Sequence, residues 1–362
     1  MRPGMRFLLD VLRGETCSDQ LSVAEWTSLL LLAEQENVLP WTSACLRSKS
    51  GRLDPILEKA LDAIDLDARI SAFYWAATLR GILSNFHCRQ IPVISLKGPW
   101  LAERLYGNAS LRVCRDLDLL VRRKDVVAAE RLLTAIGFTP AGHPQDYERP
   151  WIREDVRVEL HHDVENPRAF DFGIESAWGR SQLSSFQGIP ARLLAPADEL
   201  LFLCLHGVRH RFERLSHIVD LGLAFHHLAP RCATFRWHHN SESASVLVLG
   251  AIMATRLDPS IAISPEIYDW PRDRNHLERI AGSIWQERIL KAADAVSWSA
   301  KHKFYLEIEA SPRKRFLRRF RHFRILLSRL IDADFTFAAK LHLYRAWQVR
   351  LLRPIRLLLS SP

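Results

Sequence analysis

The chain has 362 residues and a net charge of +9, and its 48% hydrophobic and 25% charged residues are typical of a soluble globular protein with room for two domains. No run of about 18 uncharged apolar residues occurs, and the N-terminal residues do not resemble a signal peptide, so we expect a cytoplasmic protein without a transmembrane segment. The six cysteines occur singly, which argues against a zinc ribbon or a disulfide framework.

The first part of the chain, residues 1–89, is predicted to be a helical region. Ser22 and Glu25 form a capping box before an apolar run, and Asp54 followed by Pro55 is a helix start. From Leu57 onward apolar residues recur at helical spacing, which predicts a long helix to about Phe86. No residue pattern here indicates chemistry.

Residues 90–195 are predicted to form a small α/β core, because extended and helical patterns alternate along them. Strands and helices are expected in the order strand 91–96, helix 99–106, strand 116–121, helix 124–136, an extended piece from 138 and strand 156–164. Residues 196–310 return to a helical pattern that includes one long amphipathic run, 200–228. The expected fold class is therefore α+β and mostly helical, a small mixed β-sheet flanked by N-terminal and C-terminal helical regions.

Two carboxylates in the second predicted strand are the main candidates for chemistry. Asp116 and Asp118 are separated by one residue and surrounded by Leu117, Leu119 and Leu120. Alternate residues of a strand point to the same face, so the two carboxylates are expected to lie together. Like charges this close repel unless a cation lies between them, and such an oxygen-rich site suits Mg²⁺ or Mn²⁺. An ordinary exposed aspartate pair would have the same pattern.

The chain resembles the DNA polymerase β-like nucleotidyltransferase superfamily, and within it the uncharacterised bacterial nucleotidyltransferase family. The family pattern has Lys-Gly, a helix ending in Arg-Leu-Tyr, Asp-x-Asp and a later His-Gly-x-x-His. Roughly residues 20–230 match it, through Lys97-Gly98, Arg104-Leu105-Tyr106, Asp116-Leu117-Asp118 and the segment 206–210. The resemblance implies that Asp116, Asp118 and Glu159 are catalytic metal ligands.

The turn after the first strand departs from the superfamily pattern, which has Gly-Ser where this chain has Gly98 and Pro99. Glycine still permits close approach of the backbone to an anion. A triphosphate needs more positive charge than a metal alone supplies, so Lys97, Gly98, Arg112 and Arg115 are the predicted nucleotide-binding residues. The commoner fate of such lysines and arginines is a solvated surface.

The third carboxylate has several candidates in one alternating strand. Glu159, His161 and Asp163 are predicted to share a face, with Val158 and Leu160 on the other. Glu159 is preferred because it lies between those two apolar residues, whereas Asp163 at the strand end and Asp155 before the strand remain alternatives.

His161, His206, His210 and Asp220 are candidates for the substrate pocket. His206 and His210 are four residues apart and so share a helix face. Two histidines without the glutamate of His-Glu-x-x-His do not make a zinc site, and half-buried structural histidines have the same spacing. Asp220 is expected to pair with Arg209, Arg214 or His217.

The last segment, residues 311–362, is a basic amphipathic tail. It contains thirteen lysines and arginines but only two aspartates, so the tail has a net charge of +11 and the rest of the chain a net charge of −2. Packing against the body, binding to nucleic acid and peripheral contact with an anionic membrane are its three possible roles, of which packing is preferred.

The predicted function is a two-metal, ATP- or other NTP-dependent nucleotidyltransferase. It would move an NMP group to a hydroxyl of an unidentified acceptor, which could be a small molecule, peptide, protein or RNA. The alternative is a catalytically silent nucleotide- or partner-binding protein on the same fold, and a third possibility is an RNA-binding accessory protein that acts through the tail.

Overall fold

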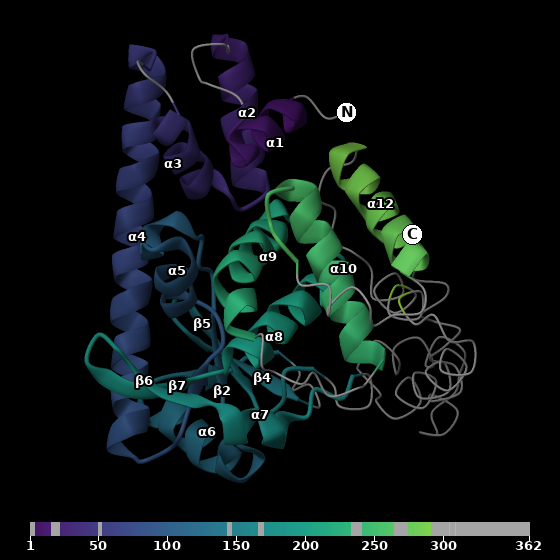
Figure 1. Cartoon of the computed structure of the whole chain (residues 1–362). Coiled ribbons are helices and arrows are strands. Elements are labelled where there is room, and N and C mark those ends of the chain that lie inside the picture. Colours follow the sequence, from purple (N-terminus) through teal and green to yellow (C-terminus); the bar gives the residue numbers. More distant parts are fainter. Residues whose placement is uncertain are drawn as a thin grey trace, which may run out of the picture.

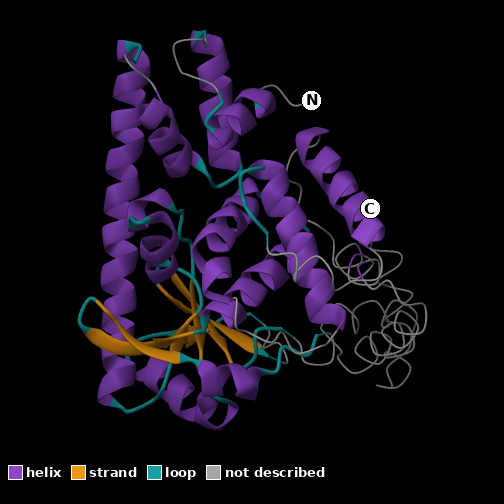
Figure 2. Ribbon diagram, in the orientation of Figure 1, coloured by secondary structure: helices purple, strands orange, loops and turns teal. Residues whose placement is uncertain are grey.

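The computed structural model describes residues 4–15, 22–49, 53–142, 147–165, 170–232, 241–263 and 274–290, together with Phe304 and Ile308. Helices surround a single seven-stranded mixed sheet (Figures 1 and 2), which confirms the predicted α+β class. The basic tail, residues 311–362, lies outside the described residues, so its role stays a prediction. Among the described helices, none has both the length and the apolar character that crossing a membrane requires.

The N-terminal region is helical as predicted, with α1 (Met5–Arg13), α2 (Val23–Gln35), α3 (Leu39–Lys49) and α4 (Pro55–Cys88). The capping box is present, because the backbone N–H of Ser22 donates to Glu25 at 2.8 Å and the Ser22 hydroxyl accepts from the Glu25 backbone N–H at 3.4 Å. The long helix α4 runs from these helices down along the sheet (Figure 1). It therefore joins the helical region to the α/β core.

The sheet has the strand order β3-β4-β5-β2-β1-β7-β6. Its strands are β1 (Ile94–Ser95), β2 (Leu117–Leu120), β3 (Thr139–Pro140), β4 (Glu148–Arg153), β5 (Val156–His161), β6 (Gln182–Phe186) and β7 (Ile189–Leu193). β2 and β5 are parallel, and their register places Asp118 beside Glu159 and Leu120 beside His161. The alternation of the sequence thus brings polar residues of two strands together on one face.

The opposite face of β2 and β5 is apolar. Leu117, Leu119, Val158 and Leu160 are buried there in one cluster with residues of α4 and of α6 (Val126–Ala135). Hydrophobic packing on this face consequently holds β2 and β5 in place, while the other face carries the polar residues. The remaining helices are α5 (Pro99–Tyr106), α7 (Ile174–Arg180), α8 (Pro196–Arg209), α9 (Leu215–Leu228), α10 (Ser241–Leu257) and α12 (Arg274–Leu290).

The helical run predicted over 200–228 is interrupted, because α8 ends at Arg209 and α9 begins at Leu215. Arg211 and Phe212 both have a φ of 51°, in the left-handed region that ends a right-handed helix. The buried Phe212 ring packs so close to Gly207 that a Cβ there would lie 2.5 Å from its Cε1 atom. A glycine in α8 therefore makes room for the turn into α9.

Candidate active site

A cavity of about 270 Å³ opens between the polar face of the sheet, α8, α9 and the turn after α2. Carboxylates, arginines and histidines converge on it. Its charged and histidine residues are Lys97, Arg112, Arg115, Asp116, Asp118, Glu159, His161, His206, Arg209, His210, Glu213, Arg214 and His217. Most of the residues that the sequence singled out are thereby brought into one place.

Asp116 and Asp118 both line the cavity, Asp116 immediately before β2 and Asp118 within it. Glu159 reaches the same cavity from the neighbouring strand β5. Asp163 and Asp155 do not line it. The Asp163 carboxylate accepts the backbone N–H of Val164 at 2.8 Å, and Asp155 accepts the hydroxyl of Tyr74 at 2.7 Å.

The pKa values of the two aspartates are shifted in opposite directions. The Nζ atom of Lys97 lies 3.1 Å from the Oδ2 atom of Asp118. Burial would raise the pKa of Asp118, but Lys97 and a hydrogen bond from His161 lower that pKa well below its usual value. Burial and the charge of Asp118 instead raise the pKa of Asp116 to about 6. Asp118 is thus firmly ionised, whereas Asp116 takes up a proton already near pH 6.

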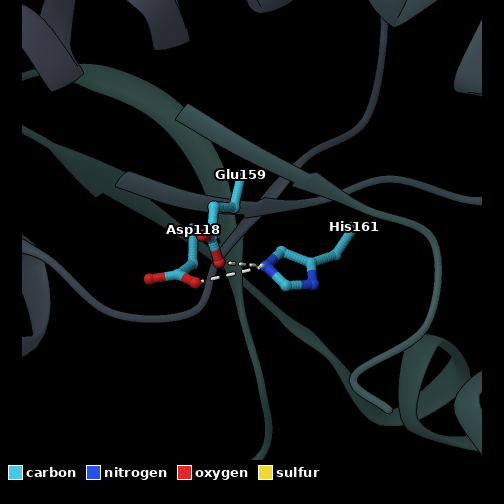
Figure 3. A group of neighbouring side chains, drawn as sticks. All are labelled: Asp118, Glu159 and His161. Atoms are coloured by element: carbon cyan, nitrogen blue, oxygen red, sulfur yellow. Dashed lines mark hydrogen bonds and ion pairs between the residues drawn. The ribbon is translucent and has the colours of Figure 1, made fainter. Parts of the chain in front are cut away.

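The buried His161 faces Asp118 and Glu159 with one ring nitrogen (Figure 3) and Glu148 with the other. Its Nε2 is 3.1 Å from Asp118 Oδ1 and 3.8 Å from Glu159 Oε2. Its Nδ1 is 3.3 Å from Glu148 Oε2, and Arg209 pairs with Glu148 at 3.1 Å. Burial would lower the pKa of His161, but the Asp118 hydrogen bond and the charge of Glu148 raise it overall. Arg209, from the His-Gly-x-x-His segment, is in this way linked to the carboxylate strands.

Arg112, one of the predicted nucleotide-binding cations, is paired with a buried carboxylate. Arg112 makes a bidentate ion pair with the buried Asp220, at 2.9 Å between Nη2 and Oδ2, and the Tyr106 hydroxyl donates to the same carboxylate at 2.6 Å. The predicted pairing of Asp220 with Arg209, Arg214 or His217 is therefore wrong, and Asp220 lies behind the cavity wall rather than in its lining. Gly98 has a φ of +79° at the start of α5 and is likewise not a lining residue.

A histidine cluster forms the wall contributed by α8 and α9. The rings of His206 and His210 are 4.6 Å apart between centroids, and His217 lies 5.2 Å and 5.3 Å from them. Burial first, and then the neighbouring positive charges of Lys97 and His210, lower the pKa values of His206 and His217 well below the usual value. The spacing of the sequence motif predicted His206 and His210, whereas the position of His217 beside them becomes visible only with the turn between α8 and α9.

The turn after α2 completes the cavity. Asn37 lines it and accepts a hydrogen bond from Arg115 Nη2 at 2.8 Å. Arg214 donates to the backbone oxygen of Gln35, and the buried Glu36 accepts the backbone N–H of Leu215 at 2.9 Å. The turn consequently holds both the loop before β2 and the start of α9. No chemistry had been predicted for this region from sequence.

Comparison with known proteins decides the family. Residues 22–252 match the model of a family described as uncharacterised nucleotidyltransferase. The chain belongs to this nucleotidyltransferase family. The match includes the turn after α2, the carboxylate strands and the histidine wall, and it confirms the resemblance predicted from the sequence. None of the curated proteins matches the chain.

Two solved structures are similar to this nucleotidyltransferase family member at low identity. One is ANT(2″)-Ia in complex with adenylyl-2″-tobramycin, with 18% identity, 50% of this chain and 97% of that chain covered, and a TM-score of 0.35. The other is JHP933 from Helicobacter pylori, with 17% identity, 60% and 93% of the two chains covered, and a TM-score of 0.27.

The residues of this cavity could hold a divalent cation. One ligand atom each from Asp118, Glu159 and His161 lies within 4.8 Å of the other two. Asp116 lines the same cavity and adds a further carboxylate. Hard divalent ions prefer such oxygen donors, so the donor set fits a metal of the kind that the family resemblance implies.

Proposed function

We propose that the chain transfers a nucleotidyl group from an NTP to a hydroxyl of an acceptor, with Mg²⁺ or Mn²⁺ as cofactor. The observation that supports this most is the parallel register of β2 and β5, which brings Asp118 and Glu159 side by side at a cavity that Asp116 also lines. Membership of a nucleotidyltransferase family gives that arrangement its chemical context.

In this proposal, Asp116 and Asp118 would hold the metal that neutralises the charge of the triphosphate. Glu159, with one of the aspartates, would hold a second metal that makes the acceptor hydroxyl more acidic. The ionised Asp118 is ready to accept a cation, and a cation would in turn favour ionisation of Asp116, whose pKa is raised without one. The two carboxylates are thus suited to bind metal and nucleotide together.

The cations of the cavity would hold the triphosphate. Lys97 lies beside Asp118, where it can contact phosphate oxygens that approach the metal. Arg115 donates to the neutral side chain of Asn37, so its charge is available to an anion. Arg112 keeps its pairing with Asp220 and so positions the loop before β2. Gly98 permits the turn that carries Lys97. The acceptor would meet the wall of His206 and His210.

The test uses each α-labelled NTP in turn with Mg²⁺ or Mn²⁺ and a cell extract, and follows the label. Asp116→Asn is the informative variant, because an amide relieves repulsion from Asp118 and should leave the metal-free protein at least as stable as the wild type. We expect metal plus NTP to raise the melting temperature of the wild type but not of this variant, and label transfer to be lost.

Asp155→Asn is the matched control, because Asp155 is exposed, lies outside the cavity and contacts Tyr74. It should retain both the thermal shift and the transfer of label. Equal thermal shifts in wild type and Asp116→Asn would contradict the metal assignment. A wild-type shift without labelled product from any NTP would identify the silent binding protein instead.

A further inference from the structure

His161 is the one nitrogen donor among the three residues that could share a metal within the described part of the chain. It extends from the end of β5, next to Leu120 of β2, while Asp118 and Glu159 are register partners two residues back along the same strands. Its side chain is only 4% exposed. Figure 3 shows the imidazole pointing at the two carboxylates.

The separations around His161 match those of ligands that share one ion. Neighbouring ligands of an octahedral ion with bonds near 2.1 Å lie about 3 Å apart, and opposite ligands about 4.2 Å apart. The imidazole Nε2 is 3.1 Å from Asp118 Oδ1 and 3.8 Å from Glu159 Oε2. Both distances fall in the range that a common ion requires, with only small adjustments of the side chains.

The other side of the imidazole has the contacts of a metal-bound histidine. Metal-ligating histidines nearly always donate the second ring N–H to a carboxylate or a carbonyl, which fixes the tautomer and the ring orientation. Here Nδ1 lies 3.3 Å from Oε2 of the buried Glu148, which is within ion-pair distance, and a small turn of the ring would let Nδ1–H donate a hydrogen bond to it. Arg209 holds Glu148 in turn, from the next helix in space, at 3.1 Å. The arrangement directs Nε2 toward Asp118 and Glu159.

We propose that His161 Nε2 is a ligand of the metal held by Asp118 and Glu159, with Glu148 and Arg209 as residues that position it. Mixed nitrogen and oxygen donors suit Mn²⁺ and later first-row ions, whereas Mg²⁺ strongly prefers oxygen. The site therefore prefers Mn²⁺ to Mg²⁺. This inference deepens the proposed function and rests on it for the metal's role in catalysis, but ligation itself is measured without any reaction.

The decisive experiment is pulsed electron paramagnetic resonance of the full chain titrated with Mn²⁺ in the absence of nucleotide. Histidine ligation gives a nitrogen coupling from the directly bound ¹⁴N. Protein grown with ¹⁵N-histidine should show the ¹⁵N pattern in its place, which assigns the signal to imidazole without any substitution. A bound ion with no nitrogen coupling would overturn the inference.

Substitutions then identify the residue and its support. His161→Gln should abolish the coupling, whereas His226→Gln, at an exposed site on α9, should leave it unchanged. Glu148→Gln should keep the coupling but weaken Mn²⁺ binding about 10–100-fold, the usual effect of removing the carboxylate behind a histidine ligand. A coupling that persists in soluble, folded His161→Gln would assign the nitrogen to another histidine and contradict the proposal.

Competition of Mg²⁺ against bound Mn²⁺ tests the preference. We expect Mn²⁺ to bind at least about tenfold more tightly in the wild type, and the ratio to fall toward unity in His161→Gln. Nitrogen coupling without nucleotidyl transfer from any NTP would leave the ligand assignment intact and refute the proposed function. Nucleotidyl transfer supported by Mn²⁺ that shows no nitrogen coupling would leave the proposed function intact and refute the assignment of His161 as a ligand.

Discussion

The sequence predicts that Glu159 and Asp163 lie on the same face of one strand, but the structure gives them different surroundings. Glu159 lies beside Asp118 and lines the cavity, with its other oxygen 2.9 Å from the exposed Arg157. Asp163 follows the end of β5, where its carboxylate accepts a backbone N–H, and burial raises its pKa to about 6. The end of the strand therefore separates two carboxylates that the alternation could not distinguish.

A pair of variants tests which of them supports catalysis. Glu159→Gln should retain thermal stabilisation by metal and NTP but lose nucleotidyl transfer by about 100-fold or more, because several kcal/mol of metal-dependent barrier lowering are removed. Asp163→Asn should change the rate by less than about tenfold, since an amide oxygen can still accept the backbone N–H. Single-turnover rates with labelled NTP measure both, and interchanged behaviour would make Asp163 the ligand.

The paired aspartates could be predicted from sequence because strand alternation is a local rule that spans two residues. Glu148 and Arg209 could not, since their contact joins residues 61 positions apart and depends on how α8 crosses the sheet. His161 was predicted for the substrate pocket, and only the register of β2 with β5 reveals how close it lies to both carboxylates. Long-range pairs of this kind leave no periodic signal.

At the scale of elements, the junction of α8 and α9 determines the histidine wall. Apolar residues continue at helical spacing through 200–228, so periodicity alone gives no sign of the interruption. The interruption depends on Gly207, which accommodates the Phe212 ring, and it is this that turns His217 back toward His206. The hairpin of β6 and β7 also escaped prediction, because a short edge hairpin carries little pattern of its own.

Gly207→Ala should destabilise the protein by about 1–3 kcal/mol. The added Cβ would lie 2.5 Å from a ring atom of the fully buried Phe212, and overpacking of that degree exceeds the gain of about 1 kcal/mol in helix propensity. Gly222→Ala in α9 is the matched control, because its Cβ would meet Ile261 at 3.7 Å, an ordinary contact. Urea unfolding of both variants gives the comparison, and equal stabilities would show that the junction tolerates the methyl group.

For the molecule as a whole, the half-buried histidines of the cavity wall link stability to pH. His206 and His217 have folded-state pKa values below the unfolded value of about 6.5, so the unfolded chain takes up protons that the folded protein refuses. Their contribution to stability is complete above that pH and is lost as the pH falls. The raised pKa values of Asp116 and Asp163, both about 6, act in the opposite direction over the same window.

The variant His217→Gln separates these effects. Between pH 7 and pH 5, the free energy of unfolding should fall less steeply in the variant, by up to about 1.4 kcal/mol per pH unit. His227→Gln, at an exposed site on α9, should follow the wild-type profile. Denaturant unfolding at half-unit pH steps provides the measurement, and identical slopes in His217→Gln and wild type would exclude a half-buried neutral histidine at this position.

The turn of residues 35–37 has a consequence for how this architecture can be inherited. It holds Arg115 from the loop before β2 and Arg214 ahead of α9, so it contacts both the α/β core and the helical region that follows it. The N-terminal helices are thus part of the enclosure of the cavity. The family match, residues 22–252, begins ahead of this turn and ends beyond α9, as expected if the smallest heritable unit is the whole enclosure of the cavity rather than the sheet alone.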